Sequence, residues 1–121
     1  MEKKYKIKFY KNSSNKEEPV LNYIKSLDTK SRLKISKYIE FLKNSSGYID
    51  EPYSKHIIDK IRELRVDFFH NHHRIFYFTF INKTIILLHA FSKNTDKTPN
   101  KEIAKALNNY QDVINNPNLY E

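Results

Sequence analysis

The pattern of apolar and polar side chains predicts four β-strands. Residues 5–10 alternate apolar with basic side chains, which is the two-residue period of a half-buried strand at a sheet edge. Residues 61–68 show the same alternation from position 63 onward, whereas residues 74–81 and 84–92 are almost continuously apolar, as in central strands. Short polar turns separate the last three strands, so we expect them to form an antiparallel meander.

Alternation within the strand at residues 61–68 assigns its side chains to two faces. The apolar side chains would face the core and the charged ones the opposite side. The apolar set is Leu64, Val66 and Phe68, and the charged set is Glu63, Arg65 and Asp67. Antiparallel pairing places the start of one strand beside the end of its neighbour, so Arg74 is expected close to Arg65.

Apolar residues at helical spacing predict two consecutive helices in the N-terminal half. The first covers about residues 17–27, with Pro19 in its first turn, where the missing N–H removes no hydrogen bond. Asp28 or Thr29 can cap the second helix. Gly47 is the only glycine of the chain and can end that helix in a left-handed conformation.

A third helix is predicted near the C-terminus. Thr98 would cap it and Pro99 would occupy its first helical position. The helical spacing ends in an Asn-rich segment, and we expect residues 115–121 to form a loose tail. Residues 48–59 show no periodicity and are expected to be an irregular connection.

The order strand, two helices, three strands and helix defines an α+β protein. We expect an antiparallel sheet, made of the N-terminal strand and the three-strand meander, packed with a helical hairpin and a C-terminal helix. A length of 121 residues without a Gly/Ser-rich linker suits one domain over residues 1–121.

Basic residues outnumber acidic ones, with 22 Lys and Arg against 14 Asp and Glu and a formal net charge of +8. This excess favours a polyanionic partner such as nucleic acid or an acidic protein. The absence of cysteine excludes disulfides, thiolate zinc sites and cysteine nucleophiles. No apolar run reaches the roughly 20 residues that span a bilayer, so we expect a cytoplasmic protein with no membrane partner.

Several classes of catalytic site lack their sequence motifs. The chain has no GxSxG motif, and a single glycine cannot build a phosphate-cradling loop. His70, His72 and His73 cluster in one predicted turn, but no HExxH motif or spaced carboxylate accompanies them, so we expect no metal and no cofactor. His89 is in phase with Leu87 and is expected to be a hydrogen-bonded core histidine.

What remains for chemistry is a concentration of basic side chains near the meander. They are Lys55, His56, Lys60, Arg62 and Arg65 around its first strand, Arg74 after the turn, and Lys93 and Lys97 beyond its last strand. Such groups can bind a phosphodiester and stabilise the negative charge that develops during its cleavage. RNA supplies its own 2′-OH as nucleophile, so a metal-free enzyme needs only positioning, charge stabilisation and acid–base help.

Consecutive sequence blocks also resemble a known family. The blocks are residues 61–65 (IRELR), 74–77 (RIFY), 87–99 (LLHAFSKNTDKTP) and 102–106 (EIAKA). In this order and spacing they resemble the RelE/ParE toxin superfamily, most closely its HigB-like, phage-derived branch. The resemblance covers about residues 5–110.

The resemblance implies the toxin of a bacterial type II toxin–antitoxin module. Such a toxin would be a ribosome-dependent mRNA endonuclease that acts without metal and inhibits translation. Its partners would be mRNA in the ribosomal A site and a cognate HigA-like helix-turn-helix antitoxin. By position in the family blocks, the catalytic residues would be Arg65, Arg74, Lys93 and Lys97. The substrate-binding residues would be Lys55, His56, Arg62 and His73.

Departures from the family pattern leave the general base and the function open at this point. His56 stands where the branch often has lysine, and Ala90 where glycine is usual, so either His56 or one of the turn histidines could be the base. One alternative function is a ParE-like toxin that inhibits gyrase without nuclease activity. Another is a non-catalytic RNA-binding module, with Tyr48, Tyr53 and Phe69 as stacking platforms.

Overall fold

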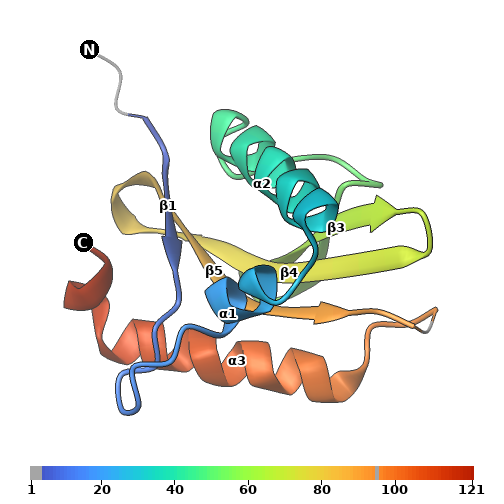
Figure 1. The fold of residues 1–121 in the computed structure, drawn as a ribbon. Helices are drawn as coiled ribbons and strands as arrows, with labels where there is room; N and C mark the ends of the chain where they lie inside the picture. Colours follow the sequence, from blue (N-terminus) through green and yellow to red (C-terminus); the bar gives the residue numbers. More distant parts are fainter. Residues whose placement is uncertain (1–3, 95) are drawn as a thin grey trace.

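A five-stranded sheet with helices on both faces organises the residues that the computed structural model describes, 4–94 and 96–121 (Figure 1). The strands are β1 (Lys6–Phe9), β2 (Ser54–Ile58), β3 (Ile61–Phe68), β4 (Asn71–Phe80) and β5 (Thr84–Ser92). The helices are α1 (Pro19–Lys25), α2 (Thr29–Asn44) and α3 (Asn100–Asn115), with short 3-10 helices at Ile81–Lys83 and Pro117–Tyr120. These elements confirm the α+β fold class.

Two apolar layers join the helices to the sheet. Helices α1 and α2 cover one face, where Val20 and Ile35 are fully buried against β3, β4 and β5 (Figure 1). Helix α3 covers the other face, where Val113 is fully buried with Phe76 and Phe78. We call these the α1/α2 face and the α3 face. Within residues 4–94 and 96–121, no helix is long and apolar enough to cross a membrane.

The predicted helix signals in the N-terminal half are confirmed. Pro19 is the first residue of α1, and Asp28 caps α2 by accepting a hydrogen bond from the Ser31 amide at 3.2 Å. Gly47 follows α2 with a φ of +80°, a conformation that L side chains rarely adopt. A Cβ at Gly47 would lie 2.6 Å from Thr79 Oγ1, so the α2 end also needs glycine for close approach to the sheet.

The sheet differs from the expected antiparallel sheet in two ways. The segment expected to be an irregular connection, residues 48–59, contains β2, which pairs with β3 at the sheet edge. Only Ser54 of β2 is buried, so this strand has no apolar alternation that could reveal it. In addition, β1 pairs with β5 in parallel, which makes the sheet mixed. Alternation assigns a strand's faces but not its direction.

Two details of the meander differ from the sequence prediction: the residue at which β4 starts and the register between β4 and β5. Strand β4 begins at Asn71, so the turn after β3 is short and His72 and His73 belong to a strand. A bulge in the β4–β5 pairing sets Phe76 opposite His89 and the next residue of β4 opposite Leu87. His89 therefore does not share a face with Leu87. It is nonetheless the expected core histidine, 9% exposed, with Nε2 3.3 Å from a Glu102 carboxylate oxygen.

The C-terminal segment is not the loose tail expected for residues 115–121. Pro117–Tyr120 form a 3-10 helix, and Tyr120 is only 3% exposed. The Tyr120 hydroxyl accepts a hydrogen bond from the Lys11 amide at 3.0 Å and donates to the Lys11 carbonyl at 3.1 Å. Burial of this aromatic ring ties the end of the chain to the α3 face, and polar composition alone did not indicate it.

Candidate functional site

Arg65 and Arg74 lie directly opposite each other on neighbouring strands of the α3 face. The register of β3 and β4 pairs these two residues, which confirms their predicted proximity. Lys93 immediately follows β5, two residues after Phe91, whose ring packs on the same face. The Lys93 amide donates to the His72 carbonyl at 2.8 Å and so continues the β4–β5 pairing. We call Arg65, Arg74 and Lys93 the basic cluster.

The carboxylate of Glu63 lies beneath the two arginines and is completely buried. Its Oε1 accepts a hydrogen bond from Arg65 Nε at 3.2 Å and lies 3.9 Å from Arg74 Nε. Its Oε2 accepts a hydrogen bond from the Thr98 hydroxyl at 3.0 Å. Like charges directly opposite each other on adjacent strands repel, so the Glu63 charge is what permits Arg65 and Arg74 to face each other.

Asp67 holds the Arg74 guanidinium at Nη1, whereas Glu63 lies near its Nε. Asp67 Oδ1 accepts hydrogen bonds from Arg74 Nη1 at 2.7 Å and from His72 Nδ1 at 2.9 Å. Partial burial raises the pKa of Asp67, but the hydrogen bonds from Arg74 and His72 outweigh it and hold the pKa below its ordinary value. An ionised carboxylate can only accept, so the hydrogen bond to Asp67 places a proton on His72 Nδ1, and in the neutral imidazole Nε2 would then be the acceptor.

Lys93 is 9% exposed and sits in a positive environment. Burial lowers the pKa of the Lys93 amine, the Glu63 carboxylate opposes this shift, and the positive charges of Arg74, Arg65 and Lys55 lower the pKa further. A lysine with a lowered pKa exchanges its proton more readily near neutral pH than an exposed lysine does.

A cavity of about 460 Å³ lies in front of Arg74 and Lys93. Its lining residues are Asp67, His72, Arg74, Lys93, Asn94 and Asp96. Among the residues described, Arg65 makes hydrogen bonds to protein only through Nε, and Arg74 only through Nη1. The other terminal guanidinium N–H groups are available to an oxyanion, so this arrangement can bind a phosphate group.

Two further predicted site residues lie near the basic cluster. Lys55 is exposed on β2 opposite Glu63 in register, so it belongs to the same face. Lys97 is exposed in the loop between β5 and α3, but it does not line the cavity. Register and charge therefore place Lys55 with Arg65, Arg74 and Lys93.

The other three predicted substrate-binding residues point to the α1/α2 face. His56 is opposite Arg62 in the β2–β3 register, and Arg62 alternates with the buried Glu63. His73 alternates with Arg74 on β4. The structure thus places His56, Arg62 and His73 on the face opposite the two arginines, because successive side chains of a strand point to opposite faces.

His73 links the sheet to α1 instead. Its Nδ1 lies 2.7 Å from the Tyr23 hydroxyl, and its Nε2 is buried without a hydrogen-bond partner among the residues described. Burial lowers the pKa of His73, which the nearby negative charge of Asp28 only partly offsets. His73 is therefore neutral where the α1/α2 layer packs on the sheet.

Thr98 has a different role from the predicted helix cap. Pro99, not Thr98, is the residue before α3, and the Thr98 hydroxyl donates to Glu63 rather than to an amide of the helix. The sequence prediction also missed Asp67 and His72 as members of the site. The predicted alternation of β3 already placed Glu63 and Asp67 beside Arg65, so counting carboxylates as well as cations on that face would have found Asp67, whereas His72 follows only from the start of β4 at Asn71.

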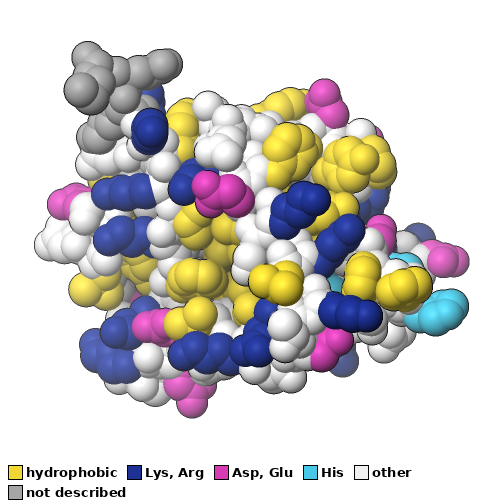
Figure 2. Space-filling view, turned by 45° about the horizontal axis from the view of Figure 1, so that its top comes forward, with side chains coloured by type: hydrophobic (Ala, Val, Ile, Leu, Met, Phe, Trp, Pro, Cys, Tyr) yellow, Lys and Arg dark blue, Asp and Glu magenta, His cyan; other side chains and the backbone are white. Residues whose placement is uncertain are grey.

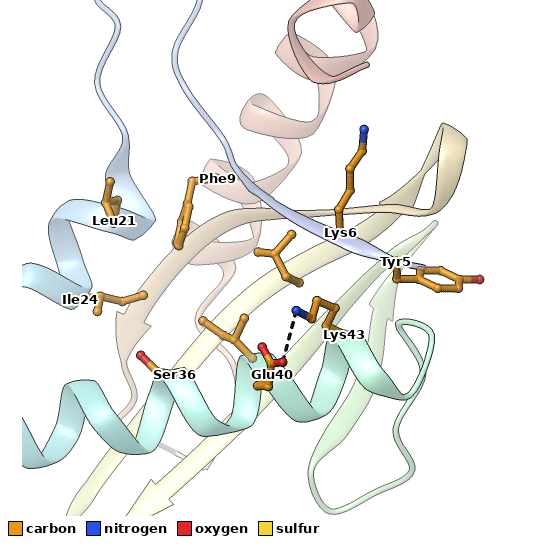
Figure 3. A pocket seen from close by; sticks show the side chains of 10 residues that line it. Tyr5, Lys6, Phe9, Leu21, Ile24, Ser36, Glu40 and Lys43 are labelled. Carbon is orange, nitrogen blue, oxygen red and sulfur yellow. Dashed lines mark ion pairs between the residues drawn. The ribbon is translucent and has the colours of Figure 1, made fainter. Parts of the chain in front are cut away.

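Basic side chains also occur on the surface away from the basic cluster. Figure 2 views the molecule from nearer the α1/α2 face and shows Lys and Arg side chains spread over several parts of the visible surface. A separate groove of about 480 Å³ lies between β1, α1 and α2 (Figure 3). Phe9 and Ile24 line it, and Lys43 pairs there with Glu40 at 3.2 Å. Net charge alone would therefore not locate the basic cluster.

Comparison with known proteins gives one family. The family model described as "Phage derived protein Gp49-like (DUF891)" matches residues 22–111 of the chain. The matched segment contains α2, all of β2 to β5, and the whole basic cluster. No curated protein matches the chain significantly.

Replacing Glu63 by glutamine is expected to destabilise the protein by about 2 kcal/mol or more, because it leaves two facing arginines without their buried countercharge. The free energy of unfolding in urea measures this loss. Asp67→Asn is the matched control, since the Asp67 side chain is 55% exposed, and it should cost less than about 1 kcal/mol. Equal losses for the two variants would contradict the role assigned to Glu63.

Stability is expected to fall as the pH decreases below the ordinary histidine pKa of about 6.5. Burial lowers the native pKa of both His73 and His89, so in that range the unfolded chain binds more protons than the native state. Urea unfolding at about pH 8 and about pH 5 measures the change. His73→Gln should reduce the pH dependence, and His70→Gln in the exposed turn should not. An unchanged dependence in His73→Gln would contradict this account.

Proposed function

Since the chain belongs to the Gp49-like family of phage-derived proteins, a family of RelE-like toxins, we propose that it is a HigB-like toxin that cleaves mRNA in the ribosomal A site. The toxin would belong to a type II toxin–antitoxin module, with a HigA-like antitoxin as its protein partner. The observation that supports nuclease activity is the basic cluster: Arg74 and the buried Lys93 line one cavity, and Arg65 lies opposite Arg74 and donates to Glu63.

Phosphate binding is the first role we assign to the cluster. Arg74 would present its free Nη2 to the scissile phosphate in the cavity, and Arg65 opposite it would contribute a second guanidinium. Both are restrained by Glu63, and Arg74 also by Asp67, so their positions are set before the substrate binds. Charge held in this way stabilises the extra negative charge on the phosphoryl oxygens in the transition state.

The cleavage step we propose needs no co-reactant beyond the RNA. The 2′-oxygen attacks phosphorus and forms the 2′-O–P bond, while the P–O5′ bond breaks and leaves a 2′,3′-cyclic phosphate. His72 Nε2 would take the proton of the 2′-OH, since Asp67 holds the ring with the other nitrogen protonated. Lys93 would give a proton to the departing 5′-oxygen, a role that suits its lowered pKa.

His72 is our candidate for the general base that the sequence left open. The side chain of His72 lines the same cavity as Arg74 and Lys93. His56 and His73 lie on the α1/α2 face, and His73 uses its Nδ1 for Tyr23. We therefore choose His72, paired with Asp67, because both line the cavity and contact each other, and not because of their positions in the family's sequence blocks.

Replacing Lys93 by methionine or His72 by glutamine is expected to reduce cleavage by about 100-fold or more, because each change removes one proton transfer. The measurement maps mRNA 5′ ends in a bacterial translation system. Lys30→Met on the exposed side of α2 and His70→Gln in the turn are matched controls, and both should cleave like the wild type.

Two outcomes of this experiment would contradict the proposal. If the wild type gives no codon-positioned cuts, the nuclease assignment fails, and supercoiling by gyrase should then be assayed as a possible target. If both variants cleave like the wild type, the site lies elsewhere. Equal cleavage of naked RNA would contradict only the dependence on the ribosome.

A further inference from the structure

A second cavity, of about 370 Å³, lies at the β2 edge of the sheet. Its lining residues are Tyr48, Asp50, Glu51, Lys55, His56 and Arg62. Three of these, Lys55, His56 and Arg62, were expected to bind substrate. His56 and Arg62 lie on the face opposite the basic cluster. Lys55 connects the two places, because it lines this cavity and its charge also acts on Lys93.

Arg62 is held rigidly in this cavity by buried groups. Its Nε donates to Ser54 Oγ at 3.1 Å, and its Nη2 donates to the Ile49 carbonyl at 3.3 Å. Ser54 Oγ in turn lies 2.7 Å from the Tyr77 hydroxyl, and both residues are completely buried. The guanidinium group is thus anchored to the core before any ligand binds.

The anchored guanidinium supports an exposed aromatic ring. Arg62 Cζ lies 4.8 Å from the centroid of the Tyr48 ring, within the range of a cation–π contact. Tyr48 is nevertheless 60% exposed, so much of its surface is available for contact. A ring positioned in this way is the kind of platform on which proteins stack the bases of single-stranded RNA.

The acidic residues of the cavity indicate which chemical group it can take. Asp50 and Glu51 would repel a phosphate, but their carboxylates can accept hydrogen bonds from the amino and imino groups of a base. Guanine carries two such donors side by side at N1 and N2, whereas uracil has a single N–H donor between two carbonyl groups. The lining therefore favours a stacked guanine over a uracil.

From these observations we propose that the Tyr48 cavity binds an unpaired guanine base of the RNA whose scissile phosphate lies at the basic cluster. This inference rests on the proposed function for the identity of the strand. Lys55 would hold the backbone that connects the two positions. The site would thus make the protein select a base close to the bond it cleaves.

The test measures binding of dye-labelled single-stranded RNA hexamers, one of uracil only and one with a single central guanine, by fluorescence anisotropy. The wild type should prefer the guanine hexamer, and Tyr48→Leu should weaken its binding by about 5- to 100-fold, the range expected for one stacked base. Tyr48→Phe keeps the ring and should bind like the wild type. Asp50→Asn combined with Glu51→Gln should remove the preference for guanine.

Tyr5→Leu is the matched control at the opposite edge of the sheet. Tyr5 directly precedes β1 and also has a lysine near its ring, with Lys83 Nζ 5.6 Å from the ring centroid. Its replacement should leave binding of both hexamers unchanged. Guanosine monophosphate should compete only weakly, because a free nucleotide cannot also reach the basic cluster.

The outcomes separate this inference from the proposed function. Loss of guanine binding in Tyr48→Leu, but not in Tyr48→Phe, supports the base site even if the wild type cleaves nothing on ribosomes. Equal binding by Tyr48→Leu and wild type, or no preference for guanine, overturns the base site even if cleavage occurs. Tight binding of guanosine monophosphate alone would identify a nucleotide site instead and would also overturn the proposal.

Discussion

The buried carboxylate of Glu63 is the constraint on which the site depends. Two arginines face each other across β3 and β4, and a third positive charge follows β5. Without a countercharge in the sheet these cations would repel one another and lose solvation. Glu63 supplies that charge from a completely buried position, and its second oxygen binds Thr98. One residue therefore sets both the geometry of the arginines and the position of the loop that leads into α3.

Strand alternation divides the polar residues of β3 and β4 between the α3 face and the α1/α2 face. Residues in phase with Glu63 form the basic cluster and its partners, Asp67 and His72. Arg62, out of phase with Glu63, packs under Tyr48 at the β2 edge, and His73 packs against Tyr23. Cations that are close in sequence thus serve different surfaces of one sheet. Lys55 lines the cavity at the β2 edge and its charge also acts on Lys93, so in our proposal one RNA strand contacts both surfaces.

The sequence predicted those parts of the fold and site that depend on local periodicity. Arg65 was placed beside Arg74 because both strands carry a clear pattern. His73 was expected in the turn but lies in β4, because polar residues do not reveal where the turn ends and the strand begins. Thr98 matches a helix cap locally, but a buried carboxylate distant in sequence competes for its hydroxyl. Strand β2 was missed because an edge strand with one buried residue has no periodicity.

The central claim is that Arg65, Arg74 and Lys93 together form a phosphate site on the α3 face. A crystal structure of the protein with a nucleoside 2′,3′-cyclic phosphate, the product of the proposed cleavage, tests it most directly. We expect the cyclic phosphate in the cavity in front of Arg74 and Lys93, within hydrogen-bonding distance of at least one arginine. A phosphate bound on the α1/α2 face, with the cavity empty, would contradict the account.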